Sequence, residues 1–122
     1  MNRIFSLLFA LAAAGACTVY AAEPASALSK NEVKALIATA STPAEHMKLA
    51  NYYRSEARQF EVDAKEHEEM AAAYYKNPSA HIIPKYPTLG EHCRSIVQRD
   101  SDAAKTATKM AAMHEEMAKA AH

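Results

Sequence analysis

The chain has 122 residues, half of them hydrophobic, and its 14 Lys and Arg balance its 14 Asp and Glu. A formal net charge of zero provides no field that would attract nucleic acid or an anionic membrane, so we expect neither as a partner. The two Gly are too few and too far apart to build a phosphate-binding loop.

Residues 1–21 have the pattern of a secretory signal peptide. Arg3 gives a positive start, residues 4–16 are an apolar run too short to span a membrane, and Ala21 closes a small-residue cleavage site. Cleavage there leaves about 100 residues, enough for one domain, in the periplasm or outside the cell. The alternative is a lipoprotein anchored to the membrane through Cys17, which follows a lipobox-like run. We favour cleavage because the usual Leu three places before that Cys is missing.

A helical domain is expected at 29–122, after a flexible leader at 22–28. Ser29 followed three residues later by Glu32 is a capping box, in which each residue satisfies a backbone N–H of the other. This predicts a short helix over about 30–40. Its apolar residues share one face, which comprises Val33, Leu36, Ile37 and Ala40.

A long helix is predicted over about 43–76, where the sequence has no internal Gly or Pro. Thr42 and Glu45 form a second capping box, and Pro43 stands at the first helical position, where a missing N–H costs nothing. Small residues recur every seventh position, at Ala50, Ala57, Ala64 and Ala71. Beside them runs a column of His46, Tyr53, Phe60, His67 and Tyr74. These columns predict a core-facing stripe whose alanine edge lets another helix approach closely.

A second long helix is predicted over about 89–120, after a Pro-containing loop of about a dozen residues. Thr88 and Glu91 form its capping box. The small residues again recur every seventh position, at Val97, Ala104, Ala111 and Ala118. The second helix therefore looks like an approximate duplicate of the first.

These elements predict an all-α fold, an antiparallel hairpin of two long helices with a short N-terminal helix. Each long helix carries a stripe wider than one partner can cover, and two helices alone bury little surface. We expect a second copy to cover the remainder, which gives a homodimeric four-helix bundle. The alternative is a monomeric three-helix bundle.

The chain resembles a group of small exported, functionally uncharacterised bacterial proteins with two long alanine-rich helices. The resemblance rests on His46, Leu49, Ala50, Tyr52 and Tyr53 in a His-x-x-Leu-Ala-x-Tyr-Tyr opening, and on the adjacent His92 and Cys93. It covers roughly residues 42–118. It implies the hairpin and the exported compartment, and it implies no activity.

Several catalytic chemistries do not fit the residue spacing. Di-iron bundles need Glu-x-x-His on facing helices, and no His of the long helices has Glu three places before it. Covalent haem attachment needs Cys-x-x-Cys-His, which is absent. His92 and Cys93 make a poor nucleophile pair because successive helical residues point about a hundred degrees apart. We therefore expect no enzymatic activity.

Metal binding is the sharpest chemical hypothesis, because imidazole, thioether and thiol groups gather at the ends of the hairpin. Imidazole suits Zn or Cu(II), and thioether with imidazole suits Cu(I). Antiparallel pairing predicts that His46 faces Met117 and that Met70 lies near the start of the second long helix. The alternative, which we favour, is that Met and His at helical spacing are ordinary core residues. The candidate ligands are His46, His67, Met70, His92, Cys93, Met110, His114 and Met117.

The sequence thus favours a non-catalytic, exported helical bundle that acts as an interaction or scaffold module of the cell envelope. It does not identify the envelope protein that would be its partner. The alternative function is a periplasmic Cu- or Zn-binding protein.

Overall fold

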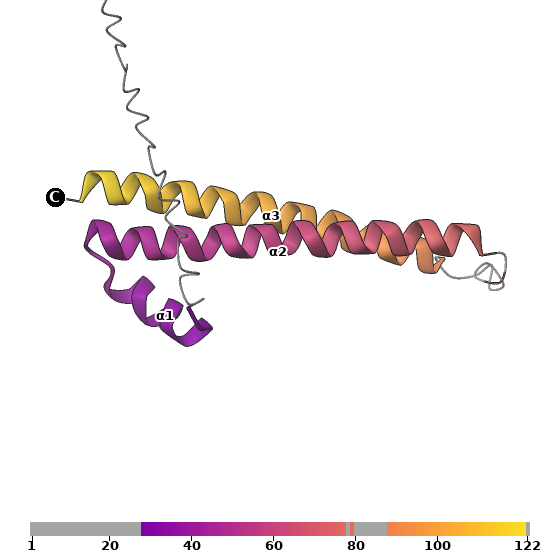
Figure 1. The fold of residues 1–122 in the computed structure, drawn as a ribbon, viewed down its shortest axis with the longest axis horizontal. Coiled ribbons are helices and arrows are strands. Elements are labelled where there is room, and N and C mark those ends of the chain that lie inside the picture. Colours follow the sequence, from indigo (N-terminus) through magenta and orange to yellow (C-terminus); the bar gives the residue numbers. More distant parts are fainter. Residues whose placement is uncertain (1–27, 78, 80–87, 122) are drawn as a thin grey trace, which may run out of the picture.

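The computed structural model describes residues 28–77, 79 and 88–121, which form three α-helices and no strand (Figure 1). The helices are α1 (Lys30–Thr39), α2 (Pro43–Lys76) and α3 (Leu89–Ala120). The predicted signal peptide, Cys17, all but the last residue of the predicted leader, and most of the predicted loop lie outside the described residues.

Each helix begins with the capping box that the sequence predicts. In α2 the Thr42 hydroxyl accepts the N–H of Glu45 at 3.3 Å, and the Glu45 carboxylate accepts the N–H of Thr42 at 3.0 Å. Ser29 and Thr88 make the equivalent bonds in α1 and α3. These contacts satisfy backbone donors that the first helical turn leaves unpaired, so the starts of all three helices are set locally.

The two long helices pack side by side as an antiparallel hairpin (Figure 1), which confirms the predicted fold class at the level of one chain. The alanines that recur every seventh residue in α2 are all buried against α3. From α3 the buried small residues are Gly90, Cys93, Ala104, Ala107 and Ala111. Small side chains on both helices let the backbones approach closely, so the seam between α2 and α3 is narrow and made largely of methyl groups.

The end of α2 rests against the start of α3 through an aromatic ring. A Cβ atom built on Gly90 would lie 2.8 Å from Cζ of Tyr75, so only glycine leaves room for this ring. The Arg94 guanidinium lies 4.8 Å from the centre of the same ring, at cation–π distance. Gly90 therefore permits the two helices to meet directly beside the turn.

Helix α1 lies along the first part of α2, on the side away from α3 (Figure 1). Its Val33 is buried, and Leu49 in the first turns of α2 is the largest side chain with no exposed surface. The short helix thus covers only one end of the hairpin. Among the described residues no helix is long and apolar enough to cross a membrane.

Candidate functional site

Two open grooves flank the seam between α2 and α3, on opposite sides. In a helix, the residues three and four places after a given position lie on either side of it. Counting from Ala57, Phe60 falls on one side of the seam and Glu61 on the other. Phe60 lines one groove and Glu61 lines the other.

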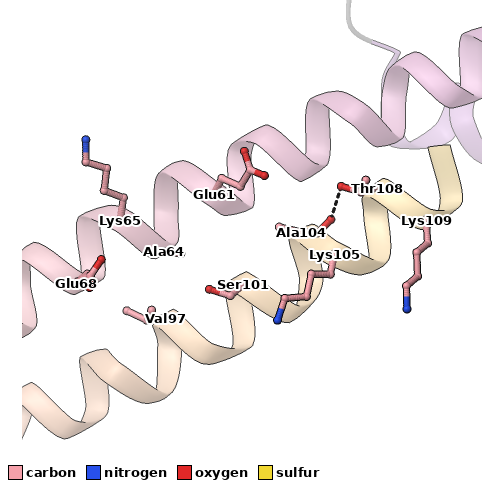
Figure 2. Close-up of a pocket in the computed structure, with 10 residues that line it drawn as sticks. All are labelled: Glu61, Ala64, Lys65, Glu68, Val97, Ser101, Ala104, Lys105, Thr108 and Lys109. Carbon is pink, nitrogen blue, oxygen red and sulfur yellow. Dashed lines mark hydrogen bonds between the residues drawn. The ribbon is translucent and has the colours of Figure 1, made fainter. Parts of the chain in front are cut away.

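The first groove, here called the charged groove, has a floor of small and aliphatic residues and a charged border (Figure 2). Lys65 and Lys109 extend away from it in Figure 2, and Thr108 donates its hydroxyl to the carbonyl of Ala104 at 2.9 Å. All the charged residues on its border are exposed. The groove is therefore compatible with permanent contact with water. It is lined by Glu61, Ala64, Lys65, Glu68, Val97, Ser101, Ala104, Lys105, Thr108 and Lys109.

The second groove, here called the aromatic groove, carries much less charge. Its only ionisable carboxyl group belongs to Glu56, which is half-buried. Burial, followed by the nearby charge of Glu56, raises the pKa of Tyr52 above its ordinary value. The ring of Tyr52 meets that of Tyr53 edge-on at 5.3 Å. The groove is lined by Tyr52, Tyr53, Glu56, Phe60, Ala103, Thr106, Ala107 and Met110.

A stack of three rings lies at the open end of the hairpin, beyond the aromatic groove. The His114 ring of α3 lies 5.6 Å from the ring of His46 and 5.7 Å from that of Tyr53. His46 and Tyr53 are seven residues apart on α2, a rise of about 10.5 Å, which leaves room for one ring between them. The Nδ1 atoms of the two histidines are 3.3 Å apart. We call these two residues the histidine pair.

An ion pair between Arg54 and Glu115 crosses the seam next to the histidine pair. Arg54 also donates to the side chain of Asn51 at 2.8 Å. Each member of the ion pair directly follows a member of the ring stack, so the same turns of both helices carry both contacts. Both contacts join α2 to α3 at the end of the hairpin opposite the loop.

The environment of His114 disfavours its charged form. Burial is the first cause and the neighbouring His46 ring the second, and together they lower the pKa of His114 below its ordinary value of 6.5. His114 is therefore a neutral imidazole at neutral pH, with one ring nitrogen free of a proton. A neutral imidazole is the form that can accept a hydrogen bond or bind a metal ion.

The structure brings only part of the predicted ligand set together. The sequence placed His46 opposite Met117, whereas the ring contact of His46 is with His114, and Met117 is 44% exposed. At the other end His92 is exposed while Cys93 is buried, as expected for neighbours on one helix. Met70 and Met110 are also exposed.

His67 lies half-buried on α2, and its Nδ1 has no hydrogen-bond partner among the described residues. Nowhere in the described part of the chain do three His, Cys, Asp or Glu side chains form a group that could hold a metal ion. The metal-binding roles of the eight candidate residues stay predictions.

No protein-family model, curated protein or solved structure matches the chain.

Two features of this end of the hairpin were not predicted from the sequence. The sequence placed Tyr53 in a core-facing column, and its ring contact with His114 was not predicted. The pairing of Arg54 with Glu115 was not predicted either. The buried Asp100 accepts a hydrogen bond from Arg99 at 2.9 Å.

Proposed function

We propose that the protein is a non-catalytic interaction module of the cell envelope that works as a homodimer, with two hairpins forming a four-helix bundle. The difference between the two grooves carries this proposal. One side of the seam is bordered by exposed charges, and the other presents aromatic rings and a methionine. Burying apolar surface against a partner stabilises the assembly by about 25 cal/mol for each Å² removed from water.

A second copy of the chain is the occupant that best fits the aromatic groove. Homodimer interfaces are more apolar at their centre than the rest of the surface, and a two-fold axis brings the same patch of both copies together. Phe60 of α2 and Met110 of α3 line the two walls of this groove. A second copy seated in the groove would contact both side chains. The charged groove then stays outside the bundle, facing water or an envelope protein.

Sedimentation equilibrium of the purified protein tests the dimer. We expect wild-type protein to be dimeric at micromolar concentration and Phe60→Glu or Met110→Glu to be monomeric, because each substitution places a charge in the apolar contact. Val62→Glu is the matched control: Val62 is an exposed aliphatic residue of α2 that lines neither groove. A monomeric wild-type protein, or equal dissociation of all three variants, contradicts the proposed interface.

The envelope location rests on the N-terminal sequence, whose structure is outside the described residues. We propose export with cleavage after Ala21, and the alternative is lipid attachment at Cys17. Intact mass measured on protein released by osmotic shock distinguishes them. A cleaved, unmodified chain in the shock fluid supports export as a soluble protein. A membrane-bound chain that Cys17→Ser releases supports the lipoprotein, and retention in the cytoplasm contradicts both.

A further inference from the structure

The aromatic groove contains one negative charge and no positive one. Glu56 supplies that charge, and none of the described residues that line the groove is Lys, Arg or His. The carboxylate is half-buried, and no ion pair between described residues includes it. Its charge reaches into the groove, since burial and then this charge raise the pKa of Tyr52. A half-buried carboxylate without a cation is poorly solvated, so the groove favours a positively charged occupant.

Aromatic rings stand around this carboxylate. The rings of Tyr52 and Tyr53 form a corner, with an angle of 74° between their planes, and Phe60 follows Glu56 by one helical turn. The faces of such rings carry a negative potential that attracts cations. From the opposite wall, α3 contributes the apolar side chain of Met110. An aromatic corner beside a carboxylate suits an alkylated ammonium group, whose charge is spread over an apolar surface.

We propose that the aromatic groove binds a small organic cation of the alkylammonium class, with Glu56 facing its charge and the rings of Tyr52 and Phe60 contacting its alkyl groups. The groove has a volume of about 290 Å³, which is at the lower end of the range for small-molecule sites. The charged groove is not equivalent, because three lysines line it and repel a cation. This ligand goes beyond the interaction function, and its binding does not require a dimer.

Titration of dilute protein with choline at constant ionic strength tests the site, with NMR shifts of the tyrosine rings and of the Met110 methyl group as the readout. The neutral isostere of choline, in which a tert-butyl group replaces the trimethylammonium group, has the same shape without the charge. We expect choline to bind more tightly than this isostere by about fivefold or more, because only choline is attracted to the carboxylate and the ring faces.

Two substitutions separate the contributions of charge and ring. Glu56→Gln should weaken choline binding by about fivefold, and Phe60→Leu by about threefold, because Leu keeps an apolar side chain but has no ring face. Glu61→Gln is the matched control, since Glu61 is an exposed carboxylate of the same helix that lines the charged groove. Circular dichroism of each variant establishes that its helices are intact.

Protein concentration distinguishes this site from the proposed dimer. If a second copy covers the groove, it excludes the cation, so the apparent affinity for choline decreases as the protein concentration rises. Choline binding that does not depend on protein concentration supports the site and counts against the dimer contact. Four results would overturn the site: no shift of the groove signals with choline, equal binding of choline and its isostere, unchanged binding in Glu56→Gln, or an equal loss in Glu61→Gln.

Discussion

Asp100 and His114 are polar residues in the seam of the hairpin, and they are accommodated in different ways. Asp100 is 4% exposed and accepts a hydrogen bond from the neighbouring Arg99, whose own side chain is largely in water. His114 instead stays neutral, and its ring contacts those of His46 and Tyr53 on α2. A buried charge needs a partner, whereas a neutral imidazole needs only contacts that fit its shape.

The stability of the metal-free protein should fall as the pH decreases below about 6.5, because of His114. The unfolded chain takes up a proton on this ring near its ordinary pKa of 6.5, and the folded chain does so only at a lower pH. Between those two values the unfolded state binds more protons, so the free energy of unfolding decreases with falling pH and levels off below the folded pKa.

Urea unfolding in the presence of a chelator, repeated at several pH values below about 7, measures how the free energy of unfolding depends on pH. His114→Asn should show a weaker dependence on pH than the wild type, and His92→Asn should keep the wild-type dependence. Identical slopes for the wild type and His114→Asn would contradict the assigned environment of this ring.

At the scale of the helices, each long element combines a locally defined start with one face of small residues. The capping boxes set where α1, α2 and α3 begin, independently of what packs against them. The alanine columns then determine how closely α2 and α3 approach, since a larger side chain at these positions would have no space. The seam should therefore tolerate substitution poorly.

Ala111→Leu should destabilise the protein by about 1–3 kcal/mol, because the added atoms force the long helices apart. Ala64→Leu should cost less, since Ala64 is 8% exposed and borders the charged groove, whereas Ala111 is 2% exposed. Urea unfolding measures both. Ala72→Leu and Ala112→Leu are the controls, because these alanines are exposed neighbours on the same helices. If the buried and exposed substitutions have equal effects, the alanine columns do not form the contact.

For the whole molecule, the hairpin has a long, thin core with few large side chains. Leu49 and Val33 are the large aliphatic residues that are buried, and both lie at the end covered by α1. Along the rest of the seam the core is made of alanines, with Cys93 near the turn. Such a core excludes water through the close approach of the two helices, because its small side chains fill little space.

Cys93 reports on whether the hairpin stays closed near the turn. Its side chain is 7% exposed, so a thiol reagent should react slowly with the native protein and rapidly once the protein is denatured. Absorbance after addition of an aromatic disulfide reagent follows the reaction. Fast native labelling would mean that this end opens readily, and a disulfide-linked dimer would place two copies of it together. Protection that a chelator removes without unfolding would instead indicate a metal held at this end.

The features of this protein that depend on local spacing could be predicted from the amino-acid sequence. The capping boxes at Ser29, Thr42 and Thr88 and the alanines at every seventh position predicted where the helices begin and which face of α2 is buried, because both follow from helical geometry within one segment. The antiparallel hairpin followed from two such helices joined by a short loop.

The contacts across the seam, and the difference between the two sides of the hairpin, depend on the folded structure of the whole chain. The repeat specifies which face of each helix is buried, but the shift of one helix along the other depends on how all the side chains pack. That shift places His114 between His46 and Tyr53, instead of His46 opposite Met117, and brings Arg54 to Glu115. A displacement of one turn, about 5.4 Å, would separate the histidine pair, so no spacing within either helix could have predicted it.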